Sequence, residues 1–287
     1  MKGLAVILVG VAALWAAEEA AAPLGTYKPA ERRHWALQPR ADVVPPVLPD
    51  AAAKAWIKTP VDAFILASLR KAGVQCTATE ASACSGTLPV CGTDDRCRGC
   101  ISHAECPSSA ACLPDGSCAS AADVAYVAPG PAGTDNATCS IEAPCTTVAK
   151  ALATGRRYLK LQGTTDEAVT IKDQAVIVLA DPGASLTRTS NGNILVIDGT
   201  SDVQISDLTI NGASGSGAGI SLPSGGSQSL TLRRVTMSGN NGTGGAFTAS
   251  GGAVSIYQST ISSNSGTGGA VTASGGTVNI YQSTITG

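Results

Sequence analysis

Short stretches in which apolar and polar residues alternate recur along the C-terminal part of the chain. Four of them align without gaps at successive offsets of 27, 24 and 24 residues, namely VQISDLTI from Val203, LTLRRVTM from Leu230, VSIYQSTI from Val254 and VNIYQSTI from Val278. Such alternation places the apolar side chains on one buried face of a β-strand. Each stretch therefore predicts a strand, and the break in its alternation predicts a corner that leads into a second strand.

The first of these repeats shows both strands. Val203 and Ile205 share one strand face, and Leu208 and Ile210 share the next one after the corner, while a strand near Val176 lies one repeat earlier. A third strand in each repeat is predicted from Ile194 and Val196, from Ile220 and Leu222, from Phe247, and from Val271. Short strands at a fixed period, separated by Gly, Ser and Asn turns, predict a right-handed parallel β-helix whose coils cover one another's apolar interior. A propeller, which needs repeats of roughly 40 residues, and a β-sandwich are the alternatives.

Stacked coils place equivalent residues in columns. Tyr257 is expected beside Tyr281 on the outside, and Asp207 falls in the same column as Arg234, which predicts an ion pair between neighbouring coils. An exposed pair of this kind contributes about 0–1 kcal/mol. Together with Arg233, these residues are the candidate ligand-binding face. A role as turn formers is favoured for Asp198, Asp202 and Asp207, and a calcium or sugar site beside Arg233 and Arg234 is the alternative.

The composition narrows the class of protein. Charged residues make up 14% of the chain, the net charge is −2, aromatic residues are 3%, and there are 33 glycines. Such a chain lacks the basic surface that nucleic-acid binding requires, so no nucleic-acid partner is expected. Few aromatics and many glycines suit a thin repetitive β-architecture that packs small aliphatic side chains.

Residues 1–22 predict a secretory signal peptide. Lys2 is followed by an apolar run from Leu4 to Trp15 and then by small residues. The run is short for a membrane-spanning helix, and an uncleaved anchor is the alternative. We therefore expect a secreted, periplasmic or outer-surface protein, whose cysteines meet an oxidising environment.

Residues 23–75 predict a linker that ends in a helix. Thr59 is a candidate N-cap, Pro60 lies in the first turn and Gly73 follows the end. The expected apolar face comprises Val61, Phe64, Ile65 and Leu69. Within residues 31–75, HWALQP followed by TPVDAFILASLRKAG resembles the opening of the DUF1549 family. That resemblance implies an exported protein of a kind often fused to cytochrome-c-like domains, and hence a redox-linked role as a further hypothesis.

Residues 76–120 predict a small module held by disulfides. In CRGCISHAEC, Ile101 follows Cys100 where haem attachment requires His, and the other cysteine gaps are too long for paired zinc ligands. A redox Cys-x-x-Cys motif would begin a helix after a strand, and turn residues surround this one. Disulfides are favoured and zinc is the alternative. The predicted disulfide cysteines are Cys76, Cys84, Cys91, Cys97, Cys100, Cys106, Cys112, Cys118, Cys139 and Cys145.

Residues 121–287 are expected to form the β-helix, which stops in mid-coil and is predicted to be incomplete at its C-terminus. Cys139 and Cys145 are close in sequence and are expected to pair, before a short helix in TTVAKALATG and a strand in YLKLQG. This order resembles the entry to pectin-lyase-like right-handed β-helix proteins, in which the helix covers the first coil. The segment from Pro89 to Ala119 resembles Cys-rich modules of myxobacterial surface proteins.

The repeats contain no histidine and few acids, and their later outward positions hold Ser, Thr, Asn and Gln. None of these is a strong acid, base or nucleophile by itself, so no catalytic residue, metal or cofactor is expected. The sequence predicts a non-enzymatic scaffold that contacts polysaccharide or cell-envelope components and self-associates through its open C-terminal coil. The alternative is a carbohydrate-active β-helix enzyme resembling polysaccharide lyases.

Overall fold

A computed structural model describes residues 44–48, 51–71, 76, 84–94 and 96–286. The predicted signal peptide and the HWALQP stretch lie outside these residues. Among the described helices, none is both long and apolar enough to cross a membrane.

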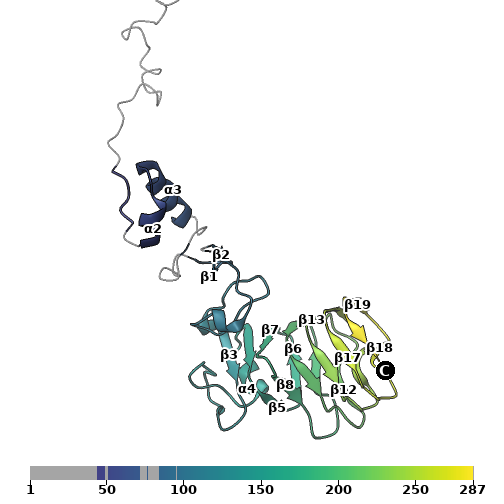
Figure 1. Cartoon of the computed structure of the whole chain (residues 1–287). Helices are drawn as coiled ribbons and strands as arrows, with labels where there is room; N and C mark the ends of the chain where they lie inside the picture. The colour runs from purple at the N-terminus through teal and green to yellow at the C-terminus, as the bar shows by residue number, and fades with distance from the viewer. Residues whose placement is uncertain (1–43, 49–50, 72–75, 77–83, 95, 287) are drawn as a thin grey trace, which may run out of the picture.

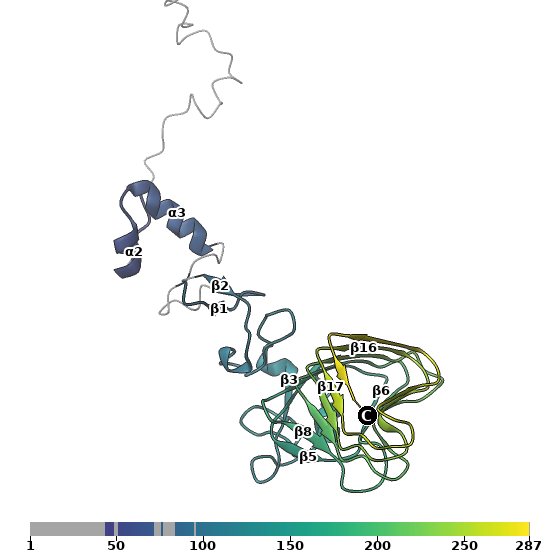
Figure 2. The ribbon, with the colours of Figure 1, turned by 45° about the vertical axis from the view of Figure 1, so that its right-hand side comes forward.

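Three parallel sheets form a β-solenoid (Figures 1 and 2). Their strand orders are β19-β16-β13-β10-β7-β4-β3, β20-β17-β14-β11-β8-β5 and β18-β15-β12-β9-β6. Every pairing within these sheets is parallel, and successive strands of one sheet come from successive coils. The predicted fold class is confirmed: a mainly β chain with a disulfide-rich region and few helices before the solenoid.

The bounds of the elements are as follows. The helices are α2 (Ala51–Trp56), α3 (Pro60–Lys71), α4 (Val148–Leu152) and the 3-10 turns η4 (His103–Glu105) and η5 (Ala121–Asp123); the strands are β1 (Val90–Cys91), β2 (Cys97–Arg98), β3 (Val124–Val127), β4 (Tyr158–Leu161), β5 (Thr164–Asp166), β6 (Val169–Lys172), β7 (Ala175–Ala180), β8 (Ser185–Thr187), β9 (Leu195–Asp198), β10 (Asp202–Ser206), β11 (Thr209–Asn211), β12 (Ala218–Leu222), β13 (Ser229–Arg233), β14 (Thr236–Ser238), β15 (Gly245–Ala249), β16 (Ala253–Tyr257), β17 (Thr260–Ser262), β18 (Val271–Ala273), β19 (Thr277–Tyr281) and β20 (Thr284–Ile285).

The register of the first sheet follows the offsets of the sequence repeats. Val203 pairs with Val176 on one side and with Leu230 on the other, and the column continues to Val254 and Val278. Within the core, one strand is shifted from its predicted register. Leu195, not Ile194, pairs with Ile220, and Val196 is only half-buried. The run ILVI is apolar throughout, so alternation could not fix which of its residues face inward.

In four successive coils, the corner between the first and second sheets is turned by a non-glycine residue in the left-handed region. Asp207, Arg234, Gln258 and Gln282 have φ values of 65°, 53°, 51° and 50°. They occupy equivalent places between the first and second sheets. This conformation turns the chain from the first sheet into the second while the flanking residues stay in their ladders, and it costs any residue other than glycine some strain.

A second corner is held by buried asparagines. Asn240 accepts a hydrogen bond from the Ala213 N–H and donates through Nδ2 to the Ile210 carbonyl and to Asn264 Oδ1. Asn264 in turn donates to the Met237 carbonyl. Both side chains are buried, and their bonds satisfy backbone groups of neighbouring coils that water cannot reach.

All ten cysteines are joined in five disulfides, and Cys139 is paired with Cys145 as predicted. The other four pairs are Cys76–Cys91, Cys84–Cys97, Cys100–Cys112 and Cys106–Cys118. The two cysteines of the Cys-x-x-Cys motif therefore belong to different disulfides. The groups of cysteine sulfurs that lie close enough for a metal are made of these bonded atoms.

The predicted short helix after Cys145 is α4. Thr147 caps it, and its side chain accepts a hydrogen bond from the Lys150 N–H. Val148, Ala151 and Leu152 are buried in the solenoid core. The helix thus covers apolar residues of the first coil.

Helix α3 forms over the predicted residues, with Thr59 and Asp62 exchanging hydrogen bonds at its start. Its predicted apolar face is wrong, because Val61, Phe64 and Ile65 are exposed. The buried residues are Ala63 and Leu66, on the opposite side of the helix. An apolar stripe predicts a helix, but it does not determine which side another element covers; α2 lies beside α3 in Figures 1 and 2.

Candidate functional site

One outward-facing column runs along the first sheet from coil to coil. Its members, in strand order from β3 to β19, are Tyr126, Lys160, Leu179, Ser206, Arg233, Tyr257 and Tyr281. The disulfide module covers the start of the column: Leu179 and Tyr126 form a small second core with Ala111 and Ala119 of the module. The Tyr126 hydroxyl also donates to the Ser109 carbonyl over 2.6 Å. The module is therefore docked on the outside of the solenoid.

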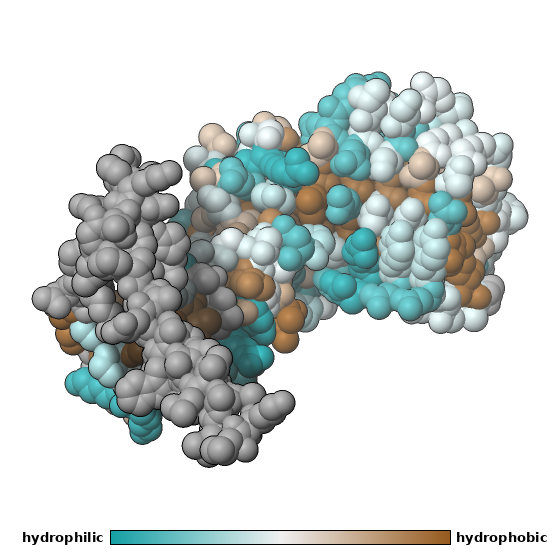
Figure 3. Space-filling view, turned by 90° about the horizontal axis from the view of Figure 1, so that it is seen from above, coloured by the Kyte–Doolittle hydropathy of each residue, from teal (hydrophilic) through white to brown (hydrophobic). Residues whose placement is uncertain are grey.

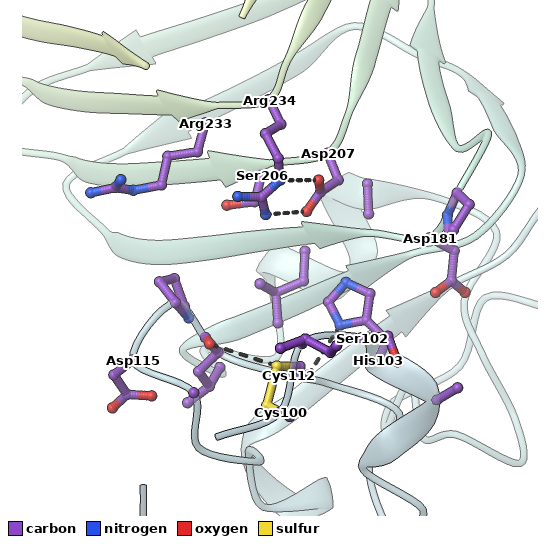
Figure 4. A pocket seen from close by; sticks show the side chains of 18 residues that line it. Cys100, Ser102, His103, Cys112, Asp115, Asp181, Ser206, Asp207, Arg233 and Arg234 are labelled. Atoms are coloured by element: carbon purple, nitrogen blue, oxygen red, sulfur yellow. Dashed lines mark hydrogen bonds and ion pairs between the residues drawn. A yellow bond between two sulfur atoms is a disulfide. The ribbon is translucent and has the colours of Figure 1, made fainter. Parts of the chain in front are cut away.

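A cleft of about 990 Å³ lies between the docked module and the solenoid (Figure 4). The module contributes Cys100 to Ala104 and Cys112 to Gly116. The solenoid contributes Leu179 to Pro182, Ser206, Asp207, Arg233 and Arg234. The structure thus brings three of the five predicted ligand-face residues, Asp207, Arg233 and Arg234, to one cleft.

Asp207 and Arg234 form the predicted ion pair between coils. Arg234 Nε lies 2.6 Å from Asp207 Oδ1, and Nη2 lies 2.8 Å from Oδ2. This two-point geometry raises the pKa of Arg234 above its ordinary value. The carboxylate of Asp207 is therefore engaged by its neighbour.

A second ion pair in the cleft region was not predicted. Lys160 is fully buried beneath the module, and its Nζ lies 2.5 Å from Asp181 Oδ1. Burial lowers the pKa of Lys160, and the Asp181 carboxylate opposes that shift. Burying a charge without a partner is costly. The Asp181 carboxylate therefore offsets the cost of burying the Lys160 ammonium beneath the module.

His103 joins the module to the solenoid. Its Nδ1 accepts a hydrogen bond from the Cys112 N–H over 3.0 Å, so the neutral ring carries its proton on Nε2. Burial lowers the pKa of His103 most, and the charge of Lys160 lowers it further, while Asp181, Asp207 and the Ala180 backbone act in the opposite direction. The ring is therefore held in its neutral form between the two parts.

Arg233 lines the cleft and leads the column on to the two tyrosines. Its guanidinium carbon lies 4.7 Å from the centroid of the Tyr257 ring, which stacks on Tyr281 at 4.8 Å and an interplanar angle of 10°. Because each ring covers its neighbour's face, their edges point outward, and a sugar cannot stack on Tyr257 as it would on an isolated aromatic ring. The two tyrosines of the predicted ligand face thus orient Arg233.

The last carboxylate of the cleft wall belongs to Asp115. Its Oδ1 accepts hydrogen bonds from the side-chain hydroxyl and the N–H of Ser117, which lower the pKa of Asp115. The groups around the cleft that sequence reasoning missed are His103, Asp115, Lys160 and Asp181. The sequence gives one indication of Lys160, because it is a charged residue in the strand YLKL, which holds two leucines. The repeats do not indicate that a separate module covers this residue.

Comparison with known proteins gives one match. Residues 53–124 match the model of a family of unknown function, DUF8331. The matched range joins α3 to the disulfide module and crosses the boundary expected at residue 75. Neither DUF1549 nor a pectin-lyase-like family matches the chain. No curated protein and no solved structure matches it.

Proposed function

We propose that this protein is an exported β-solenoid scaffold that contacts polysaccharide or other cell-envelope components without converting them. The observation that carries the proposal is the pairing of most of the ionisable groups around the cleft. Asp207 is engaged by Arg234, Lys160 by Asp181, and the Nδ1 lone pair of His103 by a backbone N–H. A general base needs a free lone pair aimed at the substrate, and these groups are engaged in holding coils and module together.

Export is supported by the five disulfides, which require an oxidising compartment, and by the signal-like pattern of residues 1–22. The destination we propose is the outer cell surface, the periplasm or the medium. The family matched by residues 53–124 has no stated function and favours no substrate.

The outer surface of the later coils suits many weak contacts. In the face that Figure 3 shows, residues of intermediate hydropathy predominate towards the C-terminal coils. The repeated stretches there place Thr236, Thr260 and Thr284 in register at equal positions of successive coils. A ligand with a repeating structure can meet such a row at several points, and the resulting avidity exceeds the affinity of each contact.

A carbohydrate-active enzyme resembling pectin-lyase-like proteins is the second candidate. Arg233 favours it, because this cation lines a cleft beside Asp207 and has no carboxylate partner among the described residues. In that case Arg233 would act on the substrate directly. The two candidates differ in whether bound polysaccharide is cut.

The test is co-sedimentation of the oxidised full chain with insoluble polysaccharides and envelope fractions, followed by analysis of the soluble fraction. The scaffold proposal expects retention of the protein and intact polymer. Export is tested separately by fractionating the producing cells and labelling thiols without reduction, which should detect none in the exported chain. Free thiols in a correctly folded, cytoplasmic protein would contradict export.

A further inference from the structure

Arg233 differs from the other cations near the cleft. Arg234 and Lys160 each have a carboxylate within ion-pair distance, whereas Arg233 has none among the described residues. Its Nε is buried and has no hydrogen-bond partner there, a property that it shares with the Nζ of Lys160. The Tyr257 ring fixes the guanidinium on one side at 4.7 Å. A cation oriented in advance loses little freedom when an anion binds it, so Arg233 is suited to receive a carboxylate.

The module side of the cleft is partly apolar. Ile101 is 83% exposed, and Leu113, Pro114 and Pro182 line the same cleft. Exposed apolar side chains beside a polar group are typical of binding surfaces. A ligand that fits has apolar groups next to its carboxylate.

The charges of the cleft limit the number of carboxylates that a ligand can carry. Asp115, Asp181 and Asp207 line the cleft with Arg233. Asp181 and Asp207 are each paired with a cation, whereas Asp115 has none within ion-pair distance among the described residues. A polymer with an acid on every unit would place further carboxylates close to Asp115, where like charges repel. One carboxylate flanked by uncharged apolar groups meets Arg233 without that cost, which favours a peptide over an acidic polysaccharide.

We propose that the cleft binds a peptide segment with a single carboxylate between apolar side chains, and that Arg233 holds the carboxylate. The apolar side chains lie against Leu113 and Pro114 of the module. The inference rests on the proposed function in one respect, since the cleft holds its ligand and does not convert it. Both the module and the solenoid are needed, because each supplies one half of the recognition.

The experiment uses the oxidised full chain and a dye-labelled peptide, Gly-Leu-Glu-Leu-Gly, capped at both ends so that it carries one carboxylate. Fluorescence anisotropy at low salt should show saturable binding. Replacing the glutamate of the peptide by glutamine should weaken binding about tenfold or more, as expected for loss of a charge-assisted hydrogen bond. Arg233→Gln should weaken the glutamate peptide similarly. Arg96→Gln, an exposed arginine outside the cleft, should leave binding unchanged.

Equal binding of the two peptides to the wild-type protein would overturn the proposal, and so would full binding by a folded Arg233→Gln variant. Binding of an oligouronate in preference to the peptide would also overturn it. The comparison of peptides on the wild type needs no variant, so it decides the question even if Arg233→Gln misfolds. If the peptide does not bind but the protein is retained on envelope material, the peptide proposal fails and the scaffold proposal stands. If the protein cuts a polysaccharide, only the scaffold proposal fails.

Discussion

Arg234 holds Asp207 by two hydrogen bonds of 2.6 and 2.8 Å across the 27 residues that separate neighbouring coils. Both side chains remain in contact with solvent, with exposures of 54% and 33%. The Lys160–Asp181 pair differs, because Lys160 is fully buried under the disulfide module. Both pairs join a basic side chain to an aspartate, but the cation is exposed to solvent in one pair and buried in the other.

This difference predicts unequal effects of the same substitution. Asp207→Asn should lower the free energy of unfolding by about 1 kcal/mol or less, since Arg234 can be solvated. Asp181→Asn should cost about 3 kcal/mol, because it leaves the buried Lys160 ammonium without a partner. Denaturant unfolding of both variants measures the two values. Equal costs would show that the module does not bury Lys160.

The neutral His103 predicts a loss of stability in mild acid. Its pKa in the folded protein is lowered below the ordinary value of 6.5, mainly by burial. The unfolded chain therefore takes up the proton first, so the contribution of His103 is present above about pH 6.5 and is lost as pH falls through the lowered pKa. Protonation also removes the lone pair that receives the Cys112 N–H.

Thermal unfolding between pH 8 and pH 5 measures this effect. His103→Gln should flatten the dependence on pH, whereas His34→Gln, which changes the other histidine of the chain, should keep it. An unchanged pH profile in His103→Gln would contradict a buried neutral ring at the junction.

A second titration is expected at lower pH. Arg98 donates two hydrogen bonds to Glu105, and these bonds, with the Ile101 N–H, lower the pKa of Glu105 to about 2. The carboxylate contributes stability above its ordinary pKa of about 4.5, and the contribution is lost as pH falls towards about 2. Glu105→Gln should flatten the unfolding midpoint over this window. The exposed Glu142→Gln serves as the control, and an identical effect of both would refute the Arg98 pairing.

The asparagines of the second corner allow a comparison between adjacent residues. Asn240→Ala leaves the Ala213 N–H and the Ile210 carbonyl without their partner in the core and should cost about 1–3 kcal/mol. Asn241→Ala changes an exposed residue whose oxygen accepts hydrogen bonds from Ser265, and should cost about 0.5 kcal/mol or less. Denaturant unfolding gives both values. A similar cost for the two would mean that the buried ladder does not stabilise the coils.

Much of the solenoid was predictable because its repeats fix register. The columns from Val176 to Val278 and from Asp207 to Arg234 follow from aligning the sequence with itself, and alternation identifies inward residues such as Ile205. Alternation cannot identify the inward residues where four apolar residues follow one another, as they do from Ile194. The prediction fails for α3 because the sequence of a helix does not specify its neighbour.

Only the solenoid side of the cleft could be predicted from the sequence. Asp207, Arg233 and Arg234 belong to the repeats, and their proximity follows from the coil period. His103 and Asp115 come from a module with a different sequence pattern, and their position depends on how Tyr126 and Leu179 dock that module on the sheet. Disulfide connectivity also lies beyond sequence reasoning, since it depends on which cysteines folding brings together.

The claim that the paired charges around the cleft are structural is tested most directly by assaying turnover. The wild-type chain is incubated with pectate, alginate and similar polymers in the presence of calcium, and the release of unsaturated products is measured. We predict that the wild-type protein releases none. Release by the wild type that is abolished in a folded Arg233→Ala variant would contradict the scaffold function and establish an enzyme.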